Sequence, residues 1–364
     1  MTEKDFLGKT YQQTLPAGVF SWQAPSNIAL VKYWGKYGEQ LPKNTSISFT
    51  LTNCNTQTHL HFEPVTEKSD EIVFDVFLDN QPAPDFKPKI AKFLARIKPY
   101  LSFLPSYKYK IETTNSFPHS SGIASSASGM AALSLCFMQL EKTLNPSMKE
   151  DFFYQKASFL ARLGSGSAAR SLKGKLVAWG EHPSIPNSSN LYGVELKENI
   201  HPIFHTYQDT ILLIDKGEKT VSSTLGHQLM NNHPFAQQRF VQANENINTL
   251  NAILKKGDTD AFIALVESEA LTLHAMMMTS NPYFILMKPN TVEVIHKIWQ
   301  YRALTKSKLC FTLDAGANVH LLYPENEKEE ILHFINKELV GYCQNGHYIC
   351  DAVGEGAIKL NLPT

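Results

Sequence analysis

Two patterns of apolar and polar positions divide the chain. In the early segments, threonine, isoleucine, valine and aromatic residues alternate with polar residues, which predicts β-strands. Asparagine, aspartate and proline separate these segments and mark turns. We expect these strands at 45–53, 56–62, 71–78 and 107–113.

A helical spacing of apolar residues first becomes clear inside a serine-rich segment. Ser126, Met130 and Leu133 recur with the helical period. We therefore expect a helix that begins among these serines and runs towards Lys142. Further helices are predicted at 89–97, 149–163, 236–255, 259–278, 290–303 and 327–339, and further strands at 176–179, 211–215, 308–314, 319–323 and 358–362.

The order of the predicted elements favours an α+β fold over a doubly wound parallel sheet, because strands and helices alternate irregularly. A length of 364 residues favours two domains. Segment 182–190 holds two prolines and five serine or asparagine residues, and a new apolar strand follows it. We therefore predict an N-terminal α+β domain over 1–195 and a C-terminal α+β domain over 196–364.

Composition narrows the classes of partner. The 34 lysine and arginine residues equal the 34 aspartate and glutamate residues, so no overall field attracts nucleic acid or an anionic membrane. The apolar stretch 123–140 is interrupted by four serines, and the N-terminus carries acidic residues without an apolar core. We expect a cytoplasmic protein that binds neither nucleic acid nor membranes.

Cysteine and histidine spacing offers no metal site. The five cysteines are scattered, and their odd number fits a reducing compartment better than a disulfide framework. His59 and His61 alternate along a predicted strand, but a third ligand is missing. We favour a solvated strand face there and expect no metal held by protein ligands alone.

The segment from Pro118 to Gly129 is the first candidate for phosphate binding. It carries Gly122, Ser125, Ser126 and Ala127 directly before the apolar helix. Free N–H groups at a helix start and nearby hydroxyls favour a bound phosphate. The Gly-Lys-Ser/Thr of a Walker loop is absent, and a serine-capped helix after a turn explains the segment equally well.

A second Gly/Ser segment precedes Arg170. Gly164, Ser165, Gly166 and Ser167 offer hydroxyls and backbone N–H groups, and the arginine adds a bidentate guanidinium. A flexible linker is the alternative. The apolar residues on both sides favour an ordered loop.

Two further segments carry charges beside apolar runs. Lys32 and Lys36 flank two aromatics and a glycine, which suits an anion grip, although surface lysines are usually solvated. Asp314 ends a predicted strand before a glycine turn, as a base or an orienting group would. A turn aspartate is the commoner explanation of that pattern. Thr224 lies in a run of hydroxyls and lysines after the predicted strand 211–215.

Taken together, these segments resemble one family. The pattern Pro-x-x-x-Gly-Ile-x-Ser-Ser-Ala at 118–127 resembles the nucleotide-phosphate loop of the galactokinase, homoserine kinase, mevalonate kinase and phosphomevalonate kinase superfamily. Within it, the segments at 27–36, 163–171, 221–224 and 314–318 resemble the mevalonate diphosphate decarboxylases. The motifs run in order from residue 24 to residue 318, so the resemblance covers most of the chain.

The resemblance implies a fold and a reaction. The fold is a ribosomal protein S5 domain 2-like N-terminal domain followed by a ferredoxin-like C-terminal domain, commonly in a homodimer, with the active site between the domains. The reaction uses ATP and Mg²⁺ to phosphorylate the 3-hydroxyl of (R)-5-diphosphomevalonate. Phosphate and CO₂ then leave to give isopentenyl diphosphate, in the mevalonate route to isoprenoids.

It also implies roles for particular residues. Asp314 orients or deprotonates the 3-hydroxyl, and Lys32 and Arg170 neutralise negative charge on the substrate. ATP binding falls to Gly122, Ser125, Ser126 and Ala127, with Ser126 near the magnesium. Binding of diphosphomevalonate falls to Tyr33, Trp34, Gly35, Lys36, Ser165, Gly166, Ser167, Ala168, Ala169, Arg170, Thr224 and Lys89.

The sequence departs from the family pattern at three places. Ala317 replaces a proline, and His119-Ser120-Ser121 replaces a more usual Thr-Ala-Ala. An arginine that binds the substrate diphosphate is absent near 85–95, where Lys87 or Lys89 is the nearest substitute. The alternatives are therefore a phosphomevalonate decarboxylase, a mevalonate 3-kinase, another small-molecule kinase, or an inactive binding protein.

Overall fold

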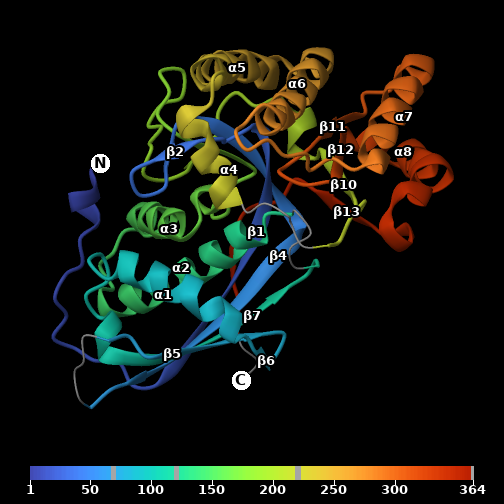
Figure 1. Cartoon of the computed structure of the whole chain (residues 1–364). Coiled ribbons are helices and arrows are strands. Elements are labelled where there is room, and N and C mark those ends of the chain that lie inside the picture. Colours follow the sequence, from blue (N-terminus) through green and yellow to red (C-terminus); the bar gives the residue numbers. More distant parts are fainter. Residues whose placement is uncertain (67–70, 119–122, 218–222, 362–364) are drawn as a thin grey trace.

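The computed structural model describes residues 1–66, 71–118, 123–217 and 223–361. Two long strands lie at the centre of its first sheet (Figure 1). β1 (Gly18–Val31) pairs antiparallel with β4 (Ser46–Pro64), and β4 pairs with β7 (Tyr107–Asn115). β5 (Phe74–Leu78) runs parallel to β7. The sheet is completed by β6 (Gln81–Pro82), β8 (Leu176–Trp179), β9 (Val194–Glu195) and β14 (Ile358–Lys359).

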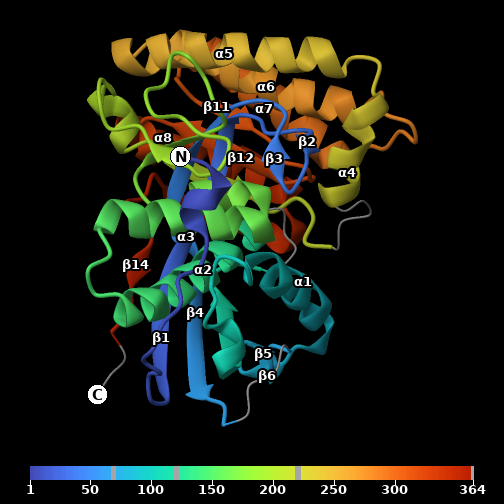
Figure 2. The same cartoon turned by 90° about the vertical axis from the view of Figure 1, so that its left-hand side faces the viewer.

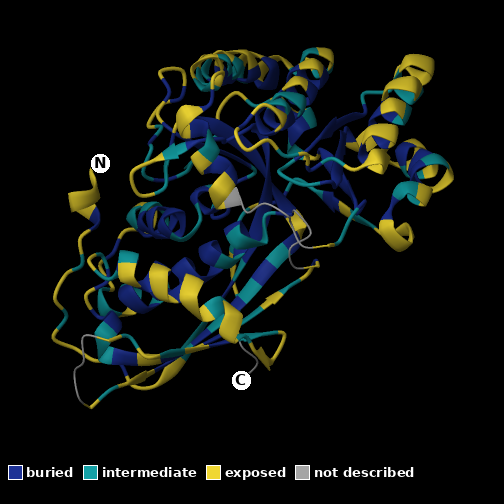
Figure 3. Cartoon of the chain, viewed as in Figure 1, coloured by how far each residue is buried: buried dark blue, intermediate teal, exposed yellow. Residues whose placement is uncertain are grey.

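Helices cover one face of this sheet. They are α1 (Lys87–Ile97), α2 (Ser125–Leu144) and α3 (Glu150–Gly164), and they lie together in both views (Figures 1 and 2). α2 lies against β1 and β4 and is itself covered by α3, so most of its residues are buried. α1 is amphipathic and exposes its outer side (Figure 3).

The second sheet has the order β11-β12-β10-β13, with all neighbours antiparallel. In chain order its strands are β10 (Gln208–Leu212), β11 (Cys310–Thr312), β12 (Val319–Tyr323) and β13 (Tyr348–Ala352). Helices α5 (Ala236–Lys256), α6 (Thr259–Met278) and α7 (Pro289–Thr305) lie between the first two strands, and α8 (Lys328–Phe334) precedes the last. This is the expected ferredoxin-like order, and the α+β class is confirmed.

The two sheets are joined through a shared core. Ile28 and Phe49 of the first sheet belong to one buried cluster with Ile211 and Phe262. The Asp351 carboxylate accepts hydrogen bonds from three successive backbone N–H groups, 52–54, in β4. β14 returns from the second half of the chain to pair with β1. The predicted domain boundary at 195/196 stays a prediction. The C-terminal strand β14 nevertheless pairs with a strand of the N-terminal part.

Several elements differ from the sequence-based expectations. The strands expected at 45–53 and 56–62 are one continuous strand, β4. The strand expected at 211–215 begins and ends three residues earlier, and the helix expected at 327–339 ends in a π-helical turn over Ile335–Leu339. β1 was not predicted because its second half is buried on both faces and therefore lacks alternation. β13 and a short helix, α4 (Ser223–Leu229), were also missed.

Within the part of the chain that the structure describes, one helix has the length and apolar character of a membrane span. It is α6, and 61% of its apolar window is buried inside the protein. α6 lies against β1 and β11, so its apolar surface serves the core.

Candidate active site

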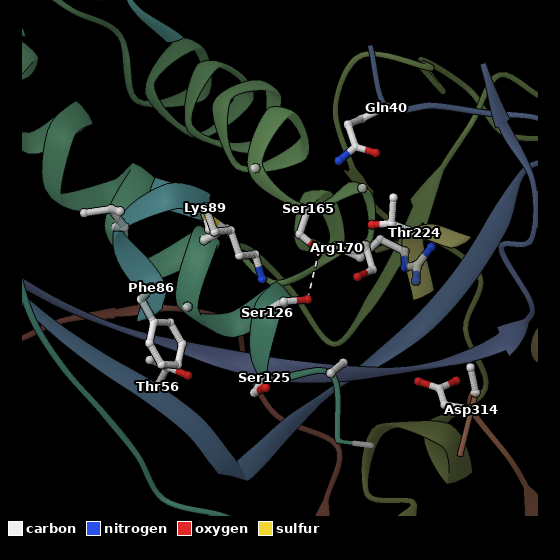
Figure 4. A pocket seen from close by; sticks show the side chains of 18 of the residues that line it. Gln40, Thr56, Phe86, Lys89, Ser125, Ser126, Ser165, Arg170, Thr224 and Asp314 are labelled. Carbon is white, nitrogen blue, oxygen red and sulfur yellow. Dashed lines mark hydrogen bonds between the residues drawn. The ribbon is translucent and has the colours of Figure 1, made fainter. Parts of the chain in front are cut away.

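A cavity of about 690 Å³ opens between the two halves of the chain (Figure 4). Residues from the end of β1, the start of α2, the loop after α3 and the loop after β11 line it. It therefore brings together segments that are far apart in the sequence. Of the predicted residues, the lining includes Lys32, Tyr33, Trp34, Lys36, Lys89, Ser125, Ser126, Ser165, Gly166, Ser167, Arg170, Thr224 and Asp314.

Four other predicted residues lie beside the cavity without lining it. Ala127, Ala168 and Ala169 are buried in the core behind the two Gly/Ser segments. Gly35 has a φ of +97°, and a side chain there would press on the Phe240 ring, so glycine is required for the turn after Trp34. Gly122 and the departure at 119–121 lie outside the described residues.

An ion pair lies at one end of the cavity. Nζ of Lys32 donates to Oδ1 of Asp314 at 3.0 Å, and the lysine is buried while the aspartate keeps contact with the cavity. Burial lowers the pKa of Lys32, and the charge of Asp314 opposes this decrease. β1 ends at Val31 and β11 at Thr312, so two rigid strands place these side chains.

A buried network that the sequence did not reveal fixes the backbone of Lys32. Its N–H donates to Glu269 at 2.8 Å, and its carbonyl accepts from Arg239 at 3.3 Å and from Asn44 at 3.0 Å. Arg239 and Glu269 form a buried bidentate pair. Arg239 lies on α5 and Glu269 on α6. In the sequence, only the position of a charged side chain on the core-facing side of each helix could have indicated this pair.

Arg170 is buried at the floor of the cavity. Its guanidinium donates to the Oγ of Ser46 and, at 3.3 Å, to Oδ1 of Asn27. Burial lowers the pKa of Arg170 to about 10, with Asp314 opposing the shift, so the side chain stays charged at neutral pH. The structure therefore places a fixed positive charge near Lys32 and Asp314.

The two Gly/Ser segments adjoin each other. Ser126 at the start of α2 and Ser165 at the end of α3 have their hydroxyls 3.1 Å apart. The Oγ of Ser26 donates to the carbonyl of Ile123 at 2.6 Å and fixes the turn before α2. Figure 4 shows Ser126 and Ser165 in the middle of the cavity, with Arg170, Thr224 and Asp314 on one side and Thr56 and Phe86 on the other.

Positive charge gathers above these hydroxyls. Lys36 donates to Gln40 at 2.8 Å, and its pKa is lowered by burial and by the neighbouring charges of Arg96 and Lys92. Lys89 extends from α1 towards Ser126 (Figure 4). A polyanion placed here would relieve the mutual repulsion of these cations.

The far end of the cavity is largely apolar. Val76, Ile90, Ile111, Met130 and Leu133 line it. Polar groups from Thr56, Thr113 and Asn115 edge this part. Among residues 1–66, 71–118, 123–217 and 223–361, no cluster of three or more histidine, cysteine, aspartate or glutamate side chains forms a metal site.

Sequence reasoning missed some lining residues. Gln40, Phe86 and His227 all line the cavity. His227 was missed with its helix, α4, because the short segment 223–229 carries too little apolar periodicity to predict one. Ala317 at the family departure is buried, and its carbonyl accepts from Thr291 at 2.7 Å, so the turn after Asp314 is anchored without proline.

Two family models match the chain. Residues 24–190 match the diphosphomevalonate decarboxylase-like N-terminal domain, and residues 210–356 match the mevalonate 5-diphosphate decarboxylase C-terminal domain. Two similar curated relatives are the diphosphomevalonate decarboxylases of Ganoderma lucidum and Candida albicans. They are 30% and 29% identical, over 86% of this chain in both cases and 80% and 86% of the relatives.

Solved structures agree with these matches. A structure described as MDDEF in complex with MVAPP, AMPPCP and magnesium superposes with a TM-score of 0.80 at 25% identity, covering 95% of this chain and 100% of the other. Mevalonate diphosphate decarboxylase from Staphylococcus aureus gives 0.80 at 26% identity, covering 95% and 98%. With both halves of the chain matched in sequence and its fold matched throughout, this protein belongs to the diphosphomevalonate decarboxylase family.

Proposed function

We infer that this protein catalyses the ATP-dependent decarboxylation of diphosphomevalonate to isopentenyl diphosphate, ADP, phosphate and CO₂. The observation that carries the inference is the Lys32–Asp314 contact of 3.0 Å, in the same cavity as two adjoining phosphate-binding segments. Two polyanions must lie side by side in this reaction. A neutral protein holds them only through local cationic and hydroxyl groups such as these.

Asp314 is the group that acts on the 3-hydroxyl. It accepts the hydroxyl proton while the hydroxyl oxygen takes the γ-phosphoryl group of ATP. The tertiary C–O bond then breaks and phosphate leaves, so positive charge builds at C3. As the phosphate leaves it takes the proton from Asp314, and the carboxylate, ionised again, stabilises that charge until the bond to the substrate carboxyl breaks and its electron pair forms the new double bond.

Lys32 and Arg170 prepare this step electrostatically. The ammonium of Lys32 orients the Asp314 carboxylate through the 3.0 Å contact. Arg170 keeps its positive charge because its pKa of about 10 lies well above neutral pH. Both cations are fixed before substrate arrives, so little reorganisation is needed during the reaction.

ATP and Mg²⁺ fit the remainder of the cavity. The apolar end suits a flat base, and the start of α2 with Ser125 and Ser126 suits the phosphates. The hydroxyls of Ser126 and Ser165 are hard oxygen donors next to that position, a donor type that suits Mg²⁺ together with phosphate oxygens and water. When bound, the ion neutralises charge on the phosphates.

A monophosphate substrate is the second candidate, and one observation favours it. Near 85–95, where the family resemblance implies an arginine, the nearest substitute in this chain is Lys87 or Lys89, and a point charge binds a diphosphate less well than a bidentate guanidinium. Against it, Arg96 and Lys92 lie close enough to Lys36 to lower its pKa, so positive charge beyond Lys89 is present near this part of the cavity.

The test is release of ADP and CO₂ with ATP and Mg²⁺, offering mevalonate, phosphomevalonate and diphosphomevalonate in parallel. We expect equal amounts of ADP and CO₂ with diphosphomevalonate. CO₂ with the monophosphate alone would assign the second candidate. ADP without CO₂ would make the protein a 3-kinase, and no turnover of any substrate would contradict an enzymatic role.

We further propose a cytoplasmic homodimer. The free cysteines suit a reducing compartment, and the large apolar side chains of Tyr283 and Ile285 are exposed and available for contact. Light scattering after size-exclusion chromatography gives the mass directly, and a monomeric mass would contradict the dimer. Activity in the membrane or secreted fraction of the source cells would contradict the location.

A further inference from the structure

His227 is a buried histidine in the wall of the active-site cavity. It lies on α4 and is 7% exposed, and no role has been assigned to it so far. Its ring packs between those of Tyr33 and Trp34, with centroids 4.3 Å and 4.7 Å away. His227 therefore lies next to the segment from Tyr33 to Lys36, which is predicted to bind the diphosphate of the substrate.

A backbone hydrogen bond fixes the position of the proton on this ring. The N–H of Gly35 donates to Nδ1 of His227 at 2.9 Å. Because a backbone amide can only donate, Nδ1 must be unprotonated, and the ring proton lies on Nε2. Burial, and then the positive charges of Lys36 and Arg170, lower the pKa of His227 to about 3, so the ring stays neutral.

The protonated nitrogen is left for a ligand. Within the described part of the chain, Nε2 of His227 has no hydrogen-bond acceptor. It is nevertheless not one of the unpartnered polar atoms that are completely buried, so it keeps some accessible surface. A buried donor that opens onto a cavity is satisfied when the cavity fills. The nearby charges of Lys36 and Arg170 favour an anionic acceptor at this place.

We propose that the Nε2–H of His227 donates a hydrogen bond to a phosphate oxygen of the bound diphosphate substrate. The inference rests on the proposed function, since it names a further contact to the same substrate. The rings of Tyr33 and Trp34 hold the imidazole in place, and the Gly35 amide holds its tautomer. The donor is thus set before the substrate binds, and binding needs no rearrangement of the side chain.

Two substitutions separate the roles of the two ring nitrogens. His227→Asn keeps an oxygen near the position of Nδ1 for the Gly35 N–H but removes the donor at Nε2. His227→Gln places an amide N–H near Nε2 but loses the acceptor at Nδ1. His233→Asn is the matched control. His233 is also 7% exposed and its Nδ1 accepts from Phe235, but its Nε2 already donates to Met276 and it does not line the cavity.

Calorimetric titration with diphosphomevalonate tests the proposal. We expect about tenfold or weaker binding by His227→Asn, a smaller loss in His227→Gln, and binding like the wild type in His233→Asn. Binding by His227→Asn within twofold of the wild type would overturn the inference. Equal losses in both His227 variants would also overturn it, because the loss would then not depend on a donor at the position of Nε2.

A spectroscopic measurement on the unmodified protein keeps the test independent of variant folding. In protein labelled with ¹⁵N-histidine, the Nε2–H signal of His227 should shift on saturation with diphosphomevalonate and again with inorganic pyrophosphate, which lacks a carboxylate. A shift with diphosphomevalonate alone would assign the substrate carboxylate as acceptor and overturn the proposal, as would no shift with either. Failure of the wild type to bind diphosphomevalonate would instead contradict the proposed function.

Discussion

Nε2 of His274 lies 3.1 Å from the main-chain carbonyl oxygen of Asp314, to which it donates, while the carboxylate of the same aspartate accepts from Lys32. Asp314 is therefore held at two points, one on its backbone and one on its side chain. His274 lies on α6 and Lys32 follows β1, so both halves of the fold position one carboxylate.

Replacing Asp314 by asparagine removes the proton acceptor and keeps the shape of the side chain. We expect Asp314→Asn to fold and bind ATP normally, with kcat lowered about 10³-fold or more. Single-turnover release of ADP and CO₂ measures the loss. The control is Asp260→Asn, which breaks a surface pair with Lys308 of 2.6 Å. Activity near that of the wild type in Asp314→Asn would remove the residue from the reaction.

The sequence predicted most of the elements that carry the site, for a physical reason. α1 buries one stripe and β7 alternates between buried and exposed residues over its first half, so their periodicity marks them. β1 and α4 escaped prediction because burial on both faces removes alternation and a two-turn helix is too short to show a period. These two elements position Lys32 and His227.

Many polar residues that line the cavity were predictable from the sequence, but the buried residues that hold them in place were not. Ser126, Arg170 and Asp314 lie in short motifs of characteristic composition. Glu269 and Arg239 belong to no motif, and they reach Lys32 only because α5 and α6 pack beside the end of β1. Contacts between residues more than 200 positions apart depend on tertiary packing.

We expect substitution of Arg170 to weaken the binding of diphosphomevalonate and to leave the binding of ATP unchanged. In Arg170→Lys the charge remains, but the hydrogen bonds to Ser46 and Asn27 cannot both be kept by an ammonium. We expect about tenfold weaker binding of diphosphomevalonate, a lower kcat, and an ATP affinity within about twofold of the wild type. Steady-state kinetics with each substrate varied in turn measures the split.

Arg302→Lys is the control for Arg170→Lys. Arg302 forms an ion pair with Glu267 and does not line the active-site cavity, so kinetic parameters should not change. If Arg170→Lys lost only ATP binding, the segment before Arg170 would bind ATP and the segment at the start of α2 would bind diphosphomevalonate, the reverse of our assignment.

We expect Lys89 to contribute to the affinity for the diphosphate. Lys89→Arg introduces a guanidinium able to contact two phosphate oxygens at once, so we expect KM for diphosphomevalonate to fall about fivefold with little change in kcat. Lys89→Ala should raise the same KM. Lys87→Arg is the control, because Lys87 lies on the same helix but pairs with Asp75 at the surface. An unchanged KM in both Lys89 variants would place the diphosphate elsewhere.

His274 makes the fold sensitive to acid. Burial lowers its pKa to about 4, against an ordinary value of 6.5 in the unfolded chain. Between these values the unfolded state binds the proton more tightly, so stability present above pH 6.5 is lost as the pH falls towards 4. At pH 4.5, two units below 6.5, the loss is about 3 kcal/mol, at roughly 1.4 kcal/mol per pH unit. His274→Gln keeps a donor for the carbonyl of Asp314 without titrating, so urea unfolding at pH 7 and pH 4.5 should show a smaller difference than in the wild type. The exposed His296→Gln should leave that difference unchanged, and an equal acid loss in wild type and His274→Gln would contradict the role of His274.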